Sequence, residues 1–185
     1  TVARYANVQL IDFHEPLYRY PFMLPDAVHP TVEGAGILAG VVYSAITGDY
    51  GGLRLSEIYS DNMVLQCGCP LDIHGVADAG EKVTVSIAGQ TESAKAGANG
   101  KWAVCLKPLQ PGGPHTLTVS TGKRRLHFEN VLVGEVWLCS GQSNMEFMMK
   151  EGVDGKVDIP QSGNAGIRLF DMKDRWRTNA VEWDA

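Results

Sequence analysis

The middle of the chain alternates hydrophobic and polar residues with a period of two. In the run 83–87 three β-branched aliphatic residues alternate with threonine and serine, and in the run 102–106 three large apolar residues alternate with alanine and cysteine. Successive side chains of a β-strand point to opposite faces, so this alternation predicts strands with one buried and one solvated face. Turn sequences, including Asn99-Gly100 and Pro111-Gly112-Gly113-Pro114, separate the runs. We therefore predict a small antiparallel β-sandwich domain over residues 53–134.

The first fifty residues follow a different pattern. Val8–Phe13 is rich in β-branched and aromatic residues and predicts a buried strand, and an irregular stretch from residue 14 to residue 25 follows it. From Pro30 onward apolar residues recur at helical spacing, and Gly48 is suited to end that helix. Gly51-Gly52 then predicts a short hinge.

The pattern changes again near Gly134. Val136–Leu138 is continuously apolar, which is typical of a strand covered on both faces of a parallel sheet. Gly141 follows where a sharp turn is expected. Met145–Met149 predicts the start of a helix, and Ile167–Phe170 predicts another short strand.

Composition narrows the classes of function. The 185 residues carry a formal net charge of -5, which argues against a nucleic acid or an anionic membrane as partner. The longest apolar run, 37–46, is interrupted by polar residues and is far shorter than a membrane helix requires. The chain begins at Thr1 without a signal-peptide core, so we expect that the natural amino terminus lies upstream or has been removed.

Cysteine and histidine spacing gives no support for a metal site. The five histidines are scattered, and the sequence has no Cys-x-x-Cys pair of the kind that zinc sites use. Cys139 follows the apolar run and is expected to be a buried free thiol. A disulfide from Cys105 to Cys67 or Cys69 stays open on spacing alone. We predict neither a metal nor an organic cofactor.

Ser143 is the strongest candidate for a nucleophile. It lies in the turn Gly141-Gln142-Ser143-Asn144-Met145, directly after the predicted strand. A serine attacks a carbonyl only when a base takes its proton and when the turn exposes its hydroxyl. Backbone N–H groups of such a turn can stabilise the developing oxyanion. Ser140 is a competing hydroxyl, but it precedes the turn.

His29 and Asp26 are the second candidate group. A neutral imidazole can take the serine proton and return it to the leaving alcohol. A carboxylate three residues earlier can hold the ring in the required tautomer. The spacing by itself also fits a turn aspartate beside an ordinary surface histidine.

Two sequence blocks resemble the SGNH/GDSL hydrolase superfamily, and its sialate O-acetylesterase branch in particular. The blocks are Gly134–Met145 around Ser143 and Leu24–Ala35 around His29. The resemblance implies that Ser143 is the nucleophile, that His29 is the base and that Asp26 orients it. Gln142 stands where many GDSL enzymes carry aspartate, as is expected within the acetylesterase branch. Gln142 and Asn144 are expected to support the loop and the oxyanion.

The order of these blocks is the reverse of the family's order, in which the serine block opens the domain and the Asp-x-x-His block closes it. We interpret residues 1–52 as the end of one SGNH domain and residues 135–185 as the start of another, with the β-sandwich between them. The predicted fold class is therefore α/β at both ends, as partial three-layer flavodoxin-like lobes, and all-β in the middle. Circular permutation is the alternative. The family's remaining oxyanion blocks occur at neither end, so other segments of a parent protein are expected partners.

The resemblance implies a carbohydrate O-acetylesterase that forms an acetyl-enzyme on serine. The expected substrate is an O-acetylated sugar, with a sialate O-acetylesterase preferred and an acetylxylan esterase as the alternative. Such an activity is expected in a secreted or periplasmic protein. A hypothesis of another class is a non-catalytic carbohydrate-binding or scaffolding fragment, in which Trp102 or an exposed Tyr59 contacts sugar. Trp102 also fits a place in the hydrophobic core, and His127 is expected to face solvent.

Overall fold

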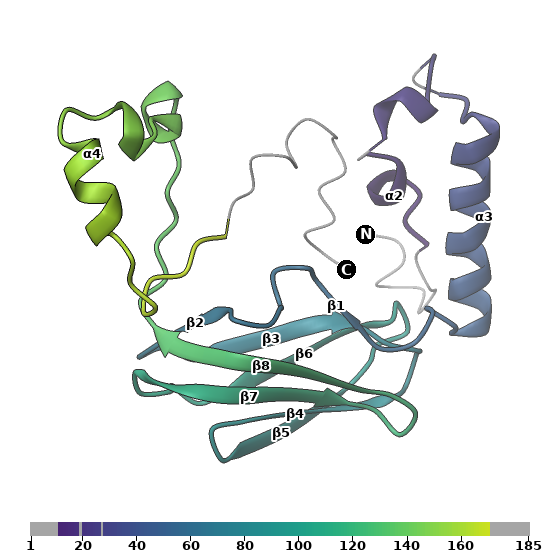
Figure 1. The fold of residues 1–185 in the computed structure, drawn as a ribbon. Helices are drawn as coiled ribbons and strands as arrows, with labels where there is room; N and C mark the ends of the chain where they lie inside the picture. The colour runs from purple at the N-terminus through teal and green to yellow at the C-terminus, as the bar shows by residue number, and fades with distance from the viewer. Residues whose placement is uncertain (1–10, 19, 27, 171–185) are drawn as a thin grey trace.

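The computed structural model describes residues 11–18, 20–26 and 28–170, and eight β-strands form the larger part of its regular secondary structure. All the strands lie between residues 54 and 134, and we call this part the β-core (Figure 1). In chain order the strands are β1 (Arg54–Leu55), β2 (Val64–Gln66), β3 (Leu71–Val76), β4 (Lys82–Ile87), β5 (Gln90–Lys95), β6 (Lys101–Leu106), β7 (Gly112–Ser120) and β8 (Arg125–Gly134).

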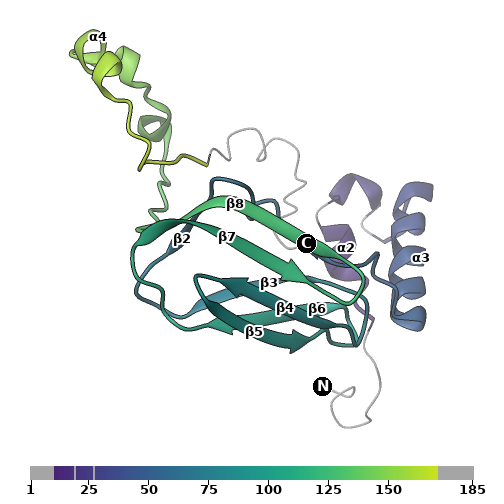
Figure 2. The same ribbon diagram turned by 60° about the horizontal axis from the view of Figure 1, so that its bottom comes forward.

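The strands form two sheets that curve around a common interior (Figure 2). The smaller sheet has the order β1-β3-β6 and the larger has the order β2-β8-β7-β4-β5. All pairs are antiparallel except β2 with β8, which run parallel with Gln66 opposite Gly134. The edge strand β2 thus ends beside the point where the chain leaves β8, and this position matters for the serine described below.

Alternating side chains from both sheets build a single hydrophobic core. In β4 and β6 every second residue is buried, which confirms the predicted alternation. The largest side chains that are almost fully enclosed are Leu53, Ile73, Val83, Val85, Leu106, Leu117, Val119 and Val131. Trp102 joins this core at 4% exposure and Tyr59 is also buried, whereas His127 is exposed as predicted. The prediction of an exposed Tyr59 is therefore wrong.

One predicted turn lies inside a strand. The stretch Pro111-Gly112-Gly113-Pro114 enters β7, which pairs with β8 through register shifts between Gly112 and Leu117. Glycine and proline therefore accompany an irregular strand pairing here rather than a hairpin loop.

Helices lie outside the β-core. They are α2 (His14–Tyr18), η1 (Pro21–Met23), α3 (Val32–Thr47), η2 (Ser143–Glu146), η3 (Met149–Glu151), α4 (Gly155–Asp158) and η4 (Ile159–Gln161), where η denotes a 3₁₀-helix. None of the described helices has the length and apolar character needed to cross a membrane.

The long helix α3 begins and ends where the sequence predicts. The Thr31 hydroxyl accepts a hydrogen bond from the Gly34 N–H at 3.2 Å and caps the first turn. Gly48 ends the helix in a left-handed conformation with φ of 74°. Few of its apolar side chains are covered, since Val32 and Ile46 are both largely exposed.

The predicted α/β lobes do not form in the described part of the chain. Val136–Leu138 is irregular rather than a strand, and Trp137 is 81% exposed. Cys139 is likewise exposed rather than buried, and Ile167–Phe170 forms no strand. A strand buried in a parallel sheet needs neighbouring strands, and no strand of the described residues pairs with these segments. In Val8–Phe13 the last three residues are irregular, and residues 8–10 lie outside the described residues.

Candidate functional site

Asp26 and His29 are in direct contact. The Asp26 Oδ2 atom lies 2.6 Å from the His29 Nδ1 atom, and Asp26 Oδ1 accepts hydrogen bonds from the backbone N–H groups of Val28 and His29. The aspartate thus closes a turn through its own backbone and holds the imidazole with its second oxygen. The His29 side chain is 81% exposed, so its Nε2 edge is accessible to a reacting group.

The hydrogen bonds to Asp26 determine the charge of its carboxyl group. Hydrogen bonds from the His29 backbone N–H, the His29 ring and the Val28 N–H lower the pKa of Asp26 from 3.8 to about 2. Asp26 is therefore ionised at neutral pH. An ionised carboxylate on Nδ1 favours the tautomer with its proton on Nδ1, which leaves Nε2 as the proton acceptor.

The position of the pair is set by the start of α3. His29 comes two residues before the capping Thr31, and the Thr31 N–H donates to the Met23 carbonyl at 2.8 Å. Gly34 packs so closely there that a Cβ atom would lie 3.1 Å from the Met23 carbonyl oxygen. The loop that carries Asp26 and His29 is thus closed at its base by contacts between η1 and α3.

Ser143 begins the short helix η2. Gln142 precedes it with extended backbone, and the Met145 N–H donates to the Gln142 carbonyl at 2.8 Å. The side chains of Ser143, Gln142 and Asn144 are all exposed. The predicted turn is therefore present and presents its serine to solvent. Its packing depends on Gly141, because a Cβ atom there would lie 2.6 Å from Met145 Cγ.

The structure brings His29 and Asp26 together but not Ser143 with them. The segment from η2 to η4 extends from one side of the β-core, and α2 and α3 lie at the other (Figures 1 and 2). No hydrogen bond between the described residues joins these two parts. In this conformation Ser143 and His29 are not arranged as one catalytic pair.

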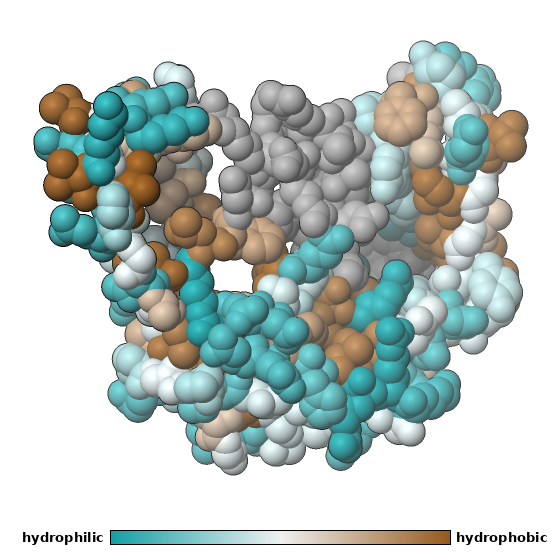
Figure 3. All heavy atoms as spheres, viewed as in Figure 1, coloured by the Kyte–Doolittle hydropathy of each residue, from teal (hydrophilic) through white to brown (hydrophobic). Residues whose placement is uncertain are grey.

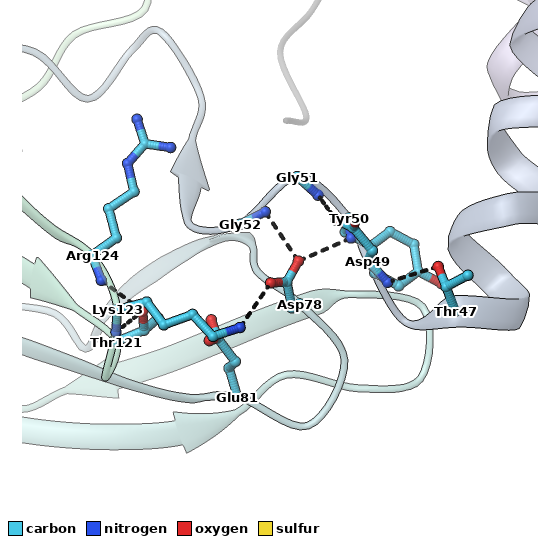
Figure 4. Close-up of polar contacts among 10 residues, drawn as sticks. All are labelled: Thr47, Asp49, Tyr50, Gly51, Gly52, Asp78, Glu81, Thr121, Lys123 and Arg124. Atoms are coloured by element: carbon cyan, nitrogen blue, oxygen red, sulfur yellow. Dashed lines mark hydrogen bonds and ion pairs between the residues drawn. The ribbon is translucent and has the colours of Figure 1, made fainter.

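A junction between α3 and the β-core fixes the part of the chain that carries His29. Asp78 Oδ1 accepts hydrogen bonds at 3.0 Å from the backbone N–H groups of both Tyr50 and Gly52 (Figure 4). Asp78 Oδ2 lies 3.4 Å from Lys123 Nζ. The N–H groups of Gly52 and Tyr50, followed by Lys123, lower the pKa of Asp78. The predicted short hinge Gly51-Gly52 is therefore tied to the β-core through the Gly52 N–H.

Tyr50 adds a second attachment at this junction. Its hydroxyl donates to the Ala98 carbonyl at 2.7 Å, and its ring packs so closely on Gly100 that a Cβ atom there would lie 2.5 Å from it. Sequence reasoning missed the role of Asp78. A turn aspartate with a spare acceptor is the available signal, but its partners lie 26 and 28 residues away.

A cleft of about 840 Å³ separates the N-terminal helices from the β-core. Its lining includes Tyr20, Tyr50, Arg54, Arg124 and Phe128 but none of the three predicted catalytic residues. Trp102 is absent from this lining and its side chain is buried, so a sugar cannot stack on it as the non-catalytic hypothesis requires. Among the described residues no three His, Cys, Asp or Glu side chains cluster as metal ligands would.

Comparison with known proteins identifies relatives of this chain. No family model matches the chain. Rat sialate O-acetylesterase is 35% identical over 135 residues, which cover 65% of this chain and 24% of that protein. The mouse enzyme is 36% identical over 136 residues, with 65% and 25% coverage. The chain is homologous to sialate O-acetylesterases. It spans about a quarter of the length of these curated relatives.

A solved structure supports the same relationship. A carbohydrate acetylesterase from Xanthomonas citri superposes with a TM-score of 0.58 at 34% sequence identity. The superposition covers 60% of this chain and 26% of the Xanthomonas protein. At this identity the similarity indicates common ancestry as well as a similar fold. The homologues are carbohydrate esterases.

Proposed function

We propose that this chain is part of a serine esterase that removes O-acetyl groups from sugars, with sialic acids as the first candidate substrates. The observation that carries the proposal is the 2.6 Å contact between Asp26 and His29 Nδ1, which leaves an exposed imidazole poised as a base. The exposed turn serine and the homology to sialate O-acetylesterases support it. Acetylxylan is the alternative substrate, and the proposed location is outside the cytoplasm.

The proposed reaction has two halves. The Ser143 Oγ attacks the acetyl carbonyl while a histidine takes its proton, and turn N–H groups stabilise the oxyanion. The C–O bond to the sugar then breaks, and the histidine returns the proton to the sugar oxygen. The same histidine then deprotonates a water molecule, which attacks the acetyl carbonyl. The bond from the carbonyl carbon to Ser143 Oγ breaks, acetate is released, and the histidine returns the proton to Ser143 Oγ.

We further propose that Ser143 and the Asp26–His29 pair belong to two different active sites of one longer protein. The reversed order of the motifs and their positions on opposite sides of the β-core support this arrangement (Figure 1). Each site is then completed by other segments of the parent protein, which would form the flanking α/β lobes. Circular permutation predicts instead that His29 and Ser143 meet in one site.

Covalent trapping tests the proposal in the full-length gene product. A fluorophosphonate should label Ser143, and Ser143→Ala should remove that label without changing the melting temperature, because only one exposed hydroxyl is lost. His29→Ala should leave labelling of Ser143 intact while it removes activity at the other site. Acetate release from acetylated sialic acid and from acetylxylan then distinguishes the two substrates.

Two results would contradict the proposal. Absence of any phosphonate label on Ser143 would favour the non-catalytic hypothesis. Loss of Ser143 labelling in His29→Ala would place both motifs in one site. The isolated 185-residue chain should release no measurable acetate, since loss of even one oxyanion donor costs on the order of 10²–10³ in kcat.

A further inference from the structure

The part of the chain that carries Ser143, residues 135–170, is fastened to the β-core at its start. We call this part the serine segment. Gln66, the last residue of β2, accepts a hydrogen bond from the Val136 N–H at 2.9 Å through Oε1. Its Nε2 donates to Glu135 Oε2 at 3.4 Å and to the Cys67 carbonyl at 3.2 Å. The side-chain amide of Gln66 thereby continues the β2–β8 hydrogen bonding beyond Gly134.

Glu135 strengthens this first attachment. Its Oε1 accepts a hydrogen bond from the Cys67 thiol at 3.3 Å, and the Cys67 N–H donates to the Gly134 carbonyl at 2.9 Å. Partial burial, followed by the hydrogen bond and charge of Glu135, raises the pKa of the Cys67 thiol. The thiol therefore stays protonated and remains a donor at neutral pH.

A second attachment holds the far end of the serine segment. The guanidinium of Arg168 returns to the same pair of strands, where Nη2 donates to Asn130 Oδ1 at 3.0 Å and Nη1 to the Met63 carbonyl at 3.3 Å. Nη1 also donates to the Asn130 carbonyl. A planar fork with several fixed donors is suited to bind an asparagine and a neighbouring carbonyl together. The Asn130 amide is itself held by Asn62 Oδ1 at 2.7 Å.

Both attachments lie on one edge of the larger sheet. Met63 precedes β2 and Gln66 ends it, so the two anchor points are roughly 10 Å apart along the strand. The chain between Val136 and Arg168 leaves and returns to this short edge, and η2 is carried on that loop. The anchors therefore set where the loop leaves the β-core and how far it can swing.

We propose that Gln66 and Arg168 are positioning residues for the Ser143 nucleophile, and that the β2–β8 edge is the platform on which the serine segment is mounted. This inference rests on the proposed esterase function. Neither side chain is proposed to touch substrate. Their effect is exerted through the backbone that carries η2, where a misplacement of about 1 Å is enough to cost on the order of 10²-fold in rate.

The test compares Gln66→Ala and Arg168→Ala with the wild type in the full-length gene product. Arg125→Ala is the matched control, because this exposed arginine lies on the same strand β8. Hydrogen–deuterium exchange of peptides from residues 136–167 reports the attachment without reference to activity. The rate of fluorophosphonate labelling of Ser143 and the separate values of kcat and KM report positioning.

We expect faster exchange in the serine segment for both variants, with the rate of Ser143 labelling reduced about 10- to 100-fold. In a His29→Ala background, which silences the other proposed site, kcat should fall by the same factor with KM little changed. Arg168→Lys keeps the charge but not the fork, so it should give a smaller loss. Arg125→Ala should match the wild type. If Arg168→Ala fails to fold, Gln66→Ala tests the same edge independently.

These measurements distinguish failure of the positioning role from failure of the proposed esterase function. Faster exchange with unchanged labelling would show that the anchors are structural only and would overturn the positioning role. Unchanged hydrogen–deuterium exchange would show that Gln66 and Arg168 do not hold the serine segment on the β-core. A wild-type protein whose Ser143 is never labelled would refute the proposed function, and the positioning role with it, even where exchange confirms the anchors.

Discussion

Asp78 ties the linker after α3 to the β-core, and its replacement by alanine tests how much that junction contributes to stability. The substitution removes the acceptor of two backbone hydrogen bonds, from Tyr50 and Gly52, together with an ion pair to Lys123 (Figure 4). Hydrogen bonds to charged groups contribute about 1.5–3 kcal/mol when well buried. The linker is only partly buried, so water replaces part of each bond, and we take about 1 kcal/mol for each.

The ion pair adds little to this sum. The Lys123 side chain is 74% exposed, and exposed pairs contribute about 0–1 kcal/mol. The expected loss for Asp78→Ala is therefore about 2–3 kcal/mol, or a fall of about 5–10 °C in melting temperature for a chain of this size. Asp78→Asn keeps a neutral acceptor and should lose about 1 kcal/mol. Lys123→Ala removes this ion pair and a second one to Glu81 at 3.2 Å, while it leaves the two backbone hydrogen bonds to Asp78 in place, and it is the control.

The pH dependence of this effect has a definite sign. The folded pKa of Asp78 lies below the ordinary 3.8, so its contribution is complete above that pH and declines as the pH falls through the lower folded value. Thermal unfolding followed by circular dichroism at pH 7 and near pH 3 should show a smaller gap between wild type and Asp78→Asn at the lower pH. Equal melting of Asp78→Ala and Lys123→Ala, or a gap that does not change with pH, would refute this reasoning.

Two further predictions concern the β-core. A polypeptide of residues 53–134 should melt cooperatively in differential scanning calorimetry, because the two sheets enclose one core, and a disordered circular dichroism spectrum would contradict the predicted boundary. Gly100→Ala should destabilise by about 1–3 kcal/mol, since φ is 74° there and the new Cβ would lie 2.5 Å from the Tyr50 ring. Gly89→Ala, also at positive φ but in open space, is the control, and equal losses in urea unfolding would show that Tyr50 packing contributes nothing.

The sequence correctly predicted the features that depend on residues close together in the chain. The alternation around β4 and β6 fixes which side chains face the core, and the helix from Val32 to Thr47 has its cap and its stop in its own sequence. The Asp26–His29 contact was also predictable, because three residues of a turn place the two side chains within reach. These features need no information from distant parts of the chain.

Features that depend on distant partners were not predictable in this way. Val136–Leu138 has the composition of a buried strand, but composition cannot supply the neighbouring strands that would cover it. The contacts of Gln66 with Glu135 and Val136 join positions about seventy residues apart, and those of Asp78 join positions nearly thirty apart. Tyr59 was expected on the surface because the sequence does not show that the two sheets close over it.

Large apolar side chains are more exposed outside the β-core than within it. The β-core covers its large aliphatic side chains at least partly, except Ile58, whereas the serine segment exposes many (Figure 3). Leu138 is 87% exposed and Leu169 is 92% exposed. α3 also exposes apolar residues, including Val32 and Ile46. Large exposed apolar patches mark interaction surfaces. The β-core has an enclosed core of its own, while the parts that carry Ser143 and His29 present uncovered apolar faces. The proposed two-site arrangement expects this, because there each part needs further chain to complete its site.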